Sequence, residues 1–238
     1  MENKNFLYII AQINPINAIF IKEYKMKDKI KFFLAAFISI MPLNILRVTL
    51  YKTIFGYKIK NSKIGFGTII NIEDCEVNNA FIGKLNLFTG PFRLKIGANS
   101  AIGFGNTFRC GKWTTNKEFE AMNFKRTFEL GESVSIDNKH YFDISGLIKI
   151  GDKTFISGNS SQFWTHGGDK KDNDIIIGKN CYIGTAVKFS PGSLIADDSI
   201  VAMGSIISKK YKKPNSLISP PAMRVLQFPE GANPLFNR

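Results

Sequence analysis

The chain contains two histidines, and one of them, His166, stands in a setting suited to acid–base chemistry. It lies in the segment Gln162-Phe-Trp-Thr-His-Gly-Gly, which leads into a polar stretch that ends at Asp174. A neutral imidazole titrates near ambient pH, so it can take a proton from a hydroxyl group that attacks an electrophile. The alternative interpretation is an exposed loop histidine without a chemical role. We expect His166 to act as a general base.

A carboxylate upstream is suited to assist that histidine. Asp143 precedes His166 by slightly more than the roughly 18 residues that fill one coil of the repeat described below. A carboxylate stacked against the imidazole would fix its tautomer and stabilise the imidazolium. The alternative is a solvated corner aspartate. His140, the other histidine, is the weaker candidate for the base.

The elements that must position these residues follow from a six-residue repeat. It runs five times without interruption from Ile177 to Ile206; each unit has a bulky apolar residue first, a small one second and a small or β-branched one fifth. A period of six fits a short strand and a sharp corner repeated around a solenoid, with three sides to a coil. Less regular units begin at Ile64, Ile82, Ile96, Ile102, Leu130, Ile136, Ile150 and Ile156.

Two segments interrupt the repeat. The polar stretch after His166 delays it until Ile177, and residues 111–129, which include Trp113, break it earlier. A loop that leaves a rigid solenoid is a natural place for a binding site. Residues 111–129 are either an excursion that shapes such a site or a degenerate pair of sides, and the sequence leaves both open.

The tandem units, together with Thr165-His166-Gly167, resemble the hexapeptide-repeat acyltransferases, and most of all the bacterial O-acetyltransferases of capsule, lipopolysaccharide and exopolysaccharide sugars. The resemblance covers roughly residues 60 to 225. It implies an all-β solenoid, a left-handed parallel β-helix, and a cytoplasmic homotrimer that uses acetyl-CoA and no metal. The γ-carbonic anhydrases share this solenoid but need three histidine ligands, so the two histidines exclude that relative.

The resemblance also implies roles for residues around His166. The imidazole would deprotonate a sugar hydroxyl as it attacks the thioester, with Asp143 as its orienter and a backbone N–H at the oxyanion. No serine or cysteine stands in a nucleophile elbow, so direct attack is expected instead of a covalent acyl-enzyme. The residues expected at the acceptor are Asn138, His140 and Trp164, the last of which either stacks on a sugar or packs beside the loop.

The acyl donor is expected along the C-terminal coils. In the family, coenzyme A lies in a groove between subunits, where small residues admit the pantetheine arm; the matching residues here are Thr185, Ala186, Ala202, Gly204 and Ser205. Lys209 and Lys210 begin a lysine cluster suited to phosphates, and the alternative interpretation is a solvated basic tail. The family's closing G-N-P-A-K/R element is replaced by Ser219-Pro-Pro-Ala-Met-Arg224, which puts Arg224 in doubt as a phosphate contact.

The first 60 residues have a different character. Basic residues from Lys25 to Lys31 precede an apolar run that ends at Met41, which is shorter than the roughly 20 residues that span a bilayer. The run also begins too far from Met1 for a signal peptide. We expect residues 1–60 to form a helical cap on the solenoid, with residues 25–58 also able to lie on the inner membrane surface. Residues 61–210 would form the β-helix and residues 211–238 a tail.

Composition narrows the remaining function classes. The 238 residues carry a formal charge of +13, which attracts phosphates, anionic lipid or nucleic acid, but no nucleic-acid-binding module is present. Three distant cysteines argue against a disulfide framework, and Cys181 holds the fifth position of its unit, where a small buried residue is expected.

The sequence therefore predicts an acetyltransferase that acts on a surface polysaccharide or its lipid-linked precursor. A second hypothesis keeps the fold and changes the acceptor to a small diffusible molecule such as serine, a galactoside, an antibiotic or a nucleotide-linked amino sugar. A third is a trimeric scaffold without activity. A fourth is a basic nucleic-acid binder, which rests on net charge alone.

Overall fold

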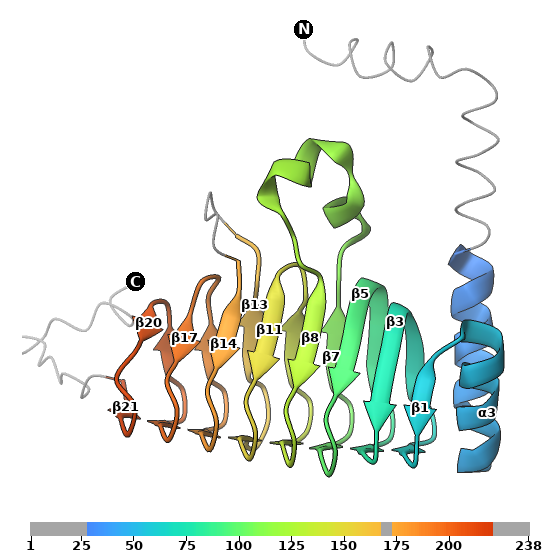
Figure 1. Cartoon of the computed structure of the whole chain (residues 1–238), viewed down its shortest axis with the longest axis horizontal. Helices are drawn as coiled ribbons and strands as arrows, with labels where there is room; N and C mark the ends of the chain where they lie inside the picture. The colour runs from blue at the N-terminus through green and yellow to red at the C-terminus, as the bar shows by residue number, and fades with distance from the viewer. Residues whose placement is uncertain (1–27, 168–172, 221–238) are drawn as a thin grey trace, which may run out of the picture.

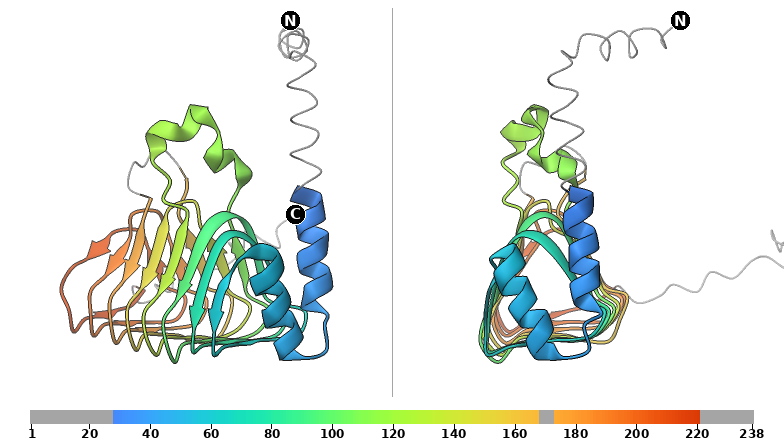
Figure 2. Two further views of the ribbon diagram at one scale, coloured as in Figure 1. Left: turned by 45° about the vertical axis from the view of Figure 1, so that its right-hand side comes forward. Right: turned by 90° about the vertical axis from the view of Figure 1, so that its right-hand side faces the viewer.

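The structure is a computed structural model that describes residues 28–167 and 173–220. Its body is a solenoid of short parallel strands wound into triangular coils, with helices at the N-terminal end (Figure 1). The triangular cross-section is seen along the solenoid in Figure 2. The prediction of an all-β solenoid with N-terminal helices is confirmed. Its left-handed winding stays a prediction.

One side of the coils belongs to a parallel sheet with eight strands in the described residues. Each of these strands has two residues, of which the second is buried, as expected where one face of a strand meets the core. The strands are β2 (Lys63–Ile64), β4 (Phe81–Ile82), β6 (Ala101–Ile102), β9 (Ser135–Ile136), β12 (Phe155–Ile156), β15 (Tyr182–Ile183), β18 (Ile200–Val201) and β21 (Leu217–Ile218).

The other two sides form one sheet, with thirteen strands in the described residues, because β3 (Ile69–Asn78) and β5 (Leu87–Ile96) bend across the corner between them. At the bend of β5, Gly90 has φ +112° and a Cβ there would lie 2.0 Å from the carbonyl oxygen of Cys110, so only glycine fits. The second side holds β7 (Thr107–Arg109), β10 (Tyr141–Asp143), β13 (Gln162–Trp164), β16 (Lys188–Phe189) and β19 (Ile206–Ile207). The third side holds β1 (Lys58–Lys60), β8 (Thr127–Leu130), β11 (Leu147–Ile150), β14 (Ile175–Ile177), β17 (Leu194–Ile195) and β20 (Lys210–Tyr211).

The six-residue period sets the core. In the tandem units both the first and the fifth residues are buried, and Cys181 is one of those at the fifth position. On the second side, five phenylalanines of consecutive coils stack with ring centroids 4.3 to 4.7 Å apart. This ladder holds neighbouring coils in register beneath the outward-facing residues; its members are Phe88, Phe108, Phe142, Phe163 and Phe189.

Two helical segments cover the first coil. Residues 28–39 are helical, and α3 (Asn44–Phe55) ends at Gly56, whose φ of 72° forms the left-handed C-cap. Tyr51 is fully buried, and its hydroxyl lies 3.1 Å from both the carbonyl oxygen of Thr68 and the backbone N–H of Ile70. The predicted helical cap is therefore confirmed by residues 28–39 and 44–55, and its residues 1–27 lie outside the described residues. No helix within the described ranges is long and apolar enough to cross a membrane.

The domain boundaries remain predictions. Paired strands run from Lys58 to Ile218, because β1 pairs with β3 and β21 pairs with β18. The strand pairing therefore begins inside the segment assigned to the cap and continues into the segment assigned to the tail.

Candidate functional site

Two corners of the triangular coil differ sharply. The chain makes tight turns at the first corner, which connects the eight-stranded sheet to the second side. The second corner, where β7, β10 and β13 end, carries two longer segments. One is residues 110–126, called the excursion, which contains η1 (Lys112–Thr115) and η2 (Lys117–Met122) and stands above the solenoid in Figure 1. The other follows Trp164, and its residues 168–172 lie outside the described residues.

His166 and Asp143 meet at the second corner. Asp143 ends β10 and pairs in register with Trp164 at the end of β13, so the coil that carries His166 stacks directly on the coil that carries Asp143. The imidazole Nδ1 contacts Oδ2 of the Asp143 carboxylate. An ionised carboxylate can only accept, so this contact places the proton on Nδ1 and leaves the Nε2 lone pair free to act as a base. The carboxylate is 5% exposed and the histidine side chain 40% exposed.

Thr165 fixes the geometry of this pair. Its buried hydroxyl donates to the carbonyl oxygen of Asp143 at 2.7 Å and accepts from the backbone N–H groups of Ser145 and Gly146 at 2.8 and 2.9 Å. The Asp143 carboxylate also accepts from the Ser145 hydroxyl and the Thr165 backbone N–H at 3.3 Å. Every hydrogen-bonding capacity of the Thr165 hydroxyl is used, so the two coils are locked where the pair forms.

The excursion brings aromatic residues over His166. The indole of Trp113 lies 5.3 Å from the imidazole in a T-shaped contact, and Phe119 and Phe124 pack on the other parts of Trp113 at 5.2 Å. Gly111 makes room for the indole, since a Cβ there would lie 2.1 Å from Trp113 Nε1. Of the two interpretations of residues 111–129, the structure shows the excursion, with β8 resuming at Thr127.

The pair lies on the wall of a groove of about 1030 Å³. Besides His166 and Asp143, its lining includes Trp113, Tyr141 and residues of the helical segment 28–39. Trp164 is half-exposed and packs against Tyr141, with ring centroids 4.9 Å apart. The volume matches that of sites that hold small ligands. Sequence reasoning assigned no role to Trp113 or Thr165, although Thr165 belongs to the Thr-His-Gly segment.

Two residues expected at the acceptor lie at the first corner instead. His140 is 1% exposed; its Nδ1 accepts from the backbone N–H of Ser161 at 3.1 Å, and burial lowers its pKa to about 4. Its Nε2 has no partner among the described residues. Asn138 accepts from the backbone N–H of Phe104 at 2.8 Å. Within one chain, neither residue lines the groove beside His166, whereas Trp164 lies close to the pair.

The residues expected at the donor also gather at the first corner, two and three coils along from Asn138. Thr185 and Gly204 stack on each other through a backbone hydrogen bond of 2.9 Å, and the Ser205 hydroxyl turns inward to the carbonyl oxygen of Ala202. Ala186 occupies the same turn as Thr185, with φ 57°. A single chain therefore does not bring these residues to His166.

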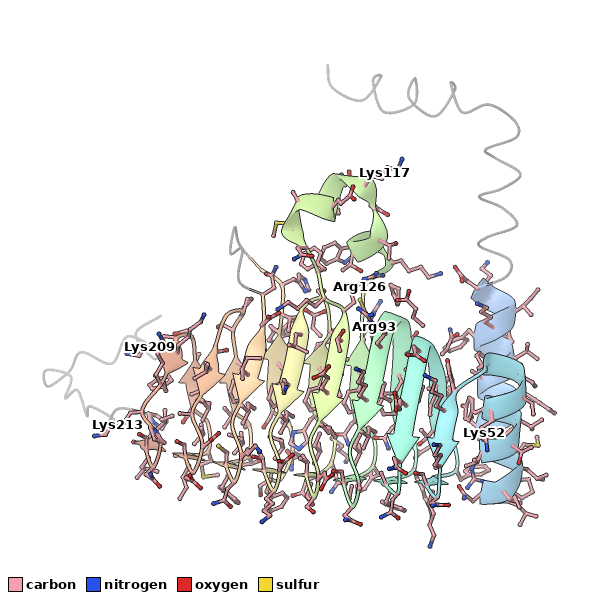
Figure 3. The ribbon with its side chains drawn as sticks, in the orientation of Figure 1. Lys52, Arg93, Lys117, Arg126, Lys209 and Lys213 are labelled. Atoms are coloured by element: carbon pink, nitrogen blue, oxygen red, sulfur yellow. The ribbon has the colours of Figure 1, made fainter. Side chains whose placement is uncertain are left out.

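The lysines lie farther toward the C-terminal end. Lys209 is exposed, and its Nζ lies 5.4 Å from the ring centroid of Tyr211. Lys210 and Tyr211 form β20. Lys209 and Lys213 mark that end of the solenoid in Figure 3. Arg224 lies outside the described residues. Among residues 28–167 and 173–220, no group of three histidine, cysteine or acidic side chains could hold a metal ion.

Comparisons with known proteins give little beyond this geometry. No protein-family model matches the chain, and no curated protein matches it. Among solved structures, it is similar to a hexapeptide-repeat-containing acetyltransferase from Vibrio cholerae, with 18% identity and a TM-score of 0.40, over 86% of this chain and 92% of that one. A likeness at this level carries no argument about activity, and the fold rests on the strand pairing described above.

Proposed function

We propose that the protein is an acetyl-CoA-dependent O-acetyltransferase whose acceptor is a sugar hydroxyl of a bacterial surface polysaccharide or of its lipid-linked precursor. One observation carries the proposal: His166 contacts the buried carboxylate of Asp143 through Nδ1 and is open to a ligand-sized groove. This arrangement supplies a base of fixed tautomer beside a space for an acceptor.

In this mechanism Nε2 of His166 takes the proton of the acceptor hydroxyl as its oxygen attacks the thioester carbonyl carbon. The Asp143 carboxylate stabilises the imidazolium that forms, and a backbone N–H stabilises the oxyanion of the tetrahedral intermediate. The intermediate then collapses: the carbon–sulfur bond breaks and the imidazolium returns its proton to the leaving thiolate. No covalent acyl-enzyme is needed.

A homotrimer would complete the site. The expected donor residues around Thr185 and Gly204 lie on a different corner from His166, so a neighbouring copy would have to present them to it. This requirement supports a donor groove between subunits, as the resemblance implies. The solution mass of the protein should then be about three times the 26.7 kDa of the chain.

Titration calorimetry with acetyl-CoA tests the donor without knowledge of the acceptor. We expect micromolar binding that the substitution Lys209→Glu weakens about tenfold, because it reverses a charge near the expected phosphates. The matched control is Lys84→Glu, an exposed lysine near the other end of the solenoid. A folded trimer that does not bind acetyl-CoA would refute the proposal.

The N-terminal helices support a peripheral position on the inner face of the cytoplasmic membrane. Phe33 is 70% exposed, and nine other large apolar residues between positions 30 and 54 are also exposed. Between residues 29 and 72 the sequence holds seven Lys and Arg and no Asp or Glu, a balance that suits anionic lipid. Lys52 projects from α3 in Figure 3.

Cosedimentation with vesicles of phosphatidylglycerol and phosphatidylcholine tests this position. The protein should sediment with the anionic vesicles, and the double substitution Phe33→Glu and Phe37→Glu should abolish sedimentation. The control Phe81→Glu changes a similarly exposed phenylalanine of β4 and should have no effect. A wild-type protein that stays in the supernatant would favour a small diffusible acceptor.

A further inference from the structure

The groove beside His166 extends well beyond the His166–Asp143 pair. It extends toward the N-terminal end of the solenoid, past the end of β7 and the bend of β5, to Asp28 and Lys31 of the helical segment. The excursion forms one wall and is held at both ends: Lys112 pairs with Asp28, and Lys125 pairs with Asp174. Together with the packing of Phe119 and Phe124 on Trp113, these two ion pairs connect the excursion to the helical segment and to the start of β14.

The charges on the lining do not balance. Its three carboxylates already have cationic or imidazole partners: Asp28 with Lys112, Glu73 with Arg126 and Asp143 with His166. Two cations of the lining, Lys31 and Arg109, have no ion-pair partner in the described part of the chain. The ion pair of Arg126 with the exposed Glu73 is long, with 3.7 Å between the guanidinium nitrogen and the carboxylate oxygen. Such an excess of positive charge attracts an anion.

Arg109 is the best placed of these cations. Arg109 ends β7 and pairs in register with Asp143, the residue that contacts His166. The Cα atoms of Arg109 and Asp143 therefore lie one strand spacing apart, about 4.8 Å. Arg126 lies at the foot of the excursion, as Figure 3 shows. A guanidinium binds carboxylate or phosphate through two parallel N–H donors, which fixes the orientation of the ligand.

Aromatic residues flank the same space. Trp113 and Tyr141 both line the groove, and Trp164 packs on Tyr141. Aromatic rings bind the apolar faces of sugars, whereas arginine binds an anionic substituent. The combination fits a ligand that has both parts.

We propose that the acceptor is an anionic sugar, whose phosphate or carboxylate is bound by Arg109 with the support of Arg126 while its hydroxyl faces Nε2 of His166. This inference rests on the proposed function, since it names the acceptor class of the same site. The anion and the reacting hydroxyl would belong to one sugar or to adjoining groups, because Arg109 and Asp143 are neighbours in the sheet.

Titration calorimetry of the full chain with glucose, glucuronate and glucose 1-phosphate tests the proposal. The charged sugars should bind at least about tenfold more tightly than glucose, and Arg109→Gln should remove that difference without changing the affinity for glucose. The matched control Arg93→Gln changes an exposed arginine of β5 that does not line the groove, and it should bind as the wild type does. The two charged probes separate carboxylate from phosphate.

Equal affinities for the neutral and charged sugars would overturn the proposal, and so would no measurable binding of either charged sugar. Arg109→Lys serves if Arg109→Gln does not fold: it keeps the charge but loses the forked donors, so charged sugars should bind with intermediate affinity. Acetyl-CoA binding to Arg109→Gln should be unchanged. A wild-type protein that does not bind acetyl-CoA would refute the proposed function but not the preference for an anionic sugar. The sugar titrations do not depend on the donor.

Discussion

His140 and His166 lie on neighbouring coils but at different corners, and they differ in almost every property. His140 is enclosed by a tight turn of the first corner, with Nδ1 bonded to a backbone N–H and a lowered pKa. His166 lies where the chain leaves the second corner, bonded to a carboxylate and open to a groove. In this solenoid a regular corner buries a histidine, whereas an interrupted corner exposes one beside the residues that can use it.

The largest expected effect concerns the partner of His166. Asp143→Asn replaces an acceptor by an amide that can donate to Nδ1, so the proton moves to Nε2 and the base is lost. We expect kcat of acetyl transfer to fall roughly 10²- to 10⁴-fold. The matched substitution at the first corner, Asp137→Asn, should leave kcat unchanged. Thiol release from acetyl-CoA measures kcat for both variants. Equal losses of kcat in Asp143→Asn and Asp137→Asn would show that the second corner has no special role in catalysis.

The next effect concerns the buried histidine. Because burial lowers the pKa of His140 from 6.5 to about 4, the unfolded chain binds a proton more readily than the native protein does between these values. Stability should therefore fall as the pH falls from 6.5 to 4, with a contribution of about 3 kcal/mol from this residue.

Urea unfolding at a series of pH values measures this contribution. His140→Gln should flatten the dependence between pH 6.5 and 4, whereas the matched substitution His166→Gln should leave it in place. A wild-type stability that does not change over this window would contradict the burial of a neutral imidazole at the first corner.

The smallest expected effect concerns the hydroxyl that joins the two coils of the site. Thr165→Val keeps the volume and leaves two backbone N–H groups and a carbonyl without this partner. We expect a loss of about 1–3 kcal/mol in the free energy of unfolding. The control Thr185→Val removes the hydroxyl of a half-buried first-corner turn residue, which bonds to the backbone of Asn159 alone among the described residues, and it should cost less. Thermal unfolding compares them, and a Thr165→Val protein as stable as the wild type would show that the hydroxyl does not lock the coils.

Much of this contrast could be predicted from the sequence. The six-residue period places first and fifth residues inside, and the rule applies to His140, the fifth residue of the unit that begins at Ile136. This rule places His140 inside the solenoid, whereas the resemblance led us to expect it at the acceptor. The proximity of Asp143 to His166 also followed from spacing, because residues about one coil apart stack on each other.

Other parts of the site could not be predicted in this way. The excursion has no period, so nothing in its sequence indicated that Trp113 would fold back over His166. The donor residues illustrate a second limit: Thr185 and Gly204 have the small size expected, but three similar corners in each coil leave open which one faces the base. Only the three-dimensional path of the chain distinguishes the corners.

The central claim is that the base acts at the interrupted corner, and the kcat of His166→Ala compared with that of His140→Gln tests it most directly. Both are measured by thiol release from acetyl-CoA with the best acceptor from the sugar panel, per mole of folded protein. We predict that His166→Ala loses at least about 10²-fold in kcat and that His140→Gln stays within a few-fold of the wild type. Activity that survives His166→Ala and disappears with His140→Gln would contradict the account.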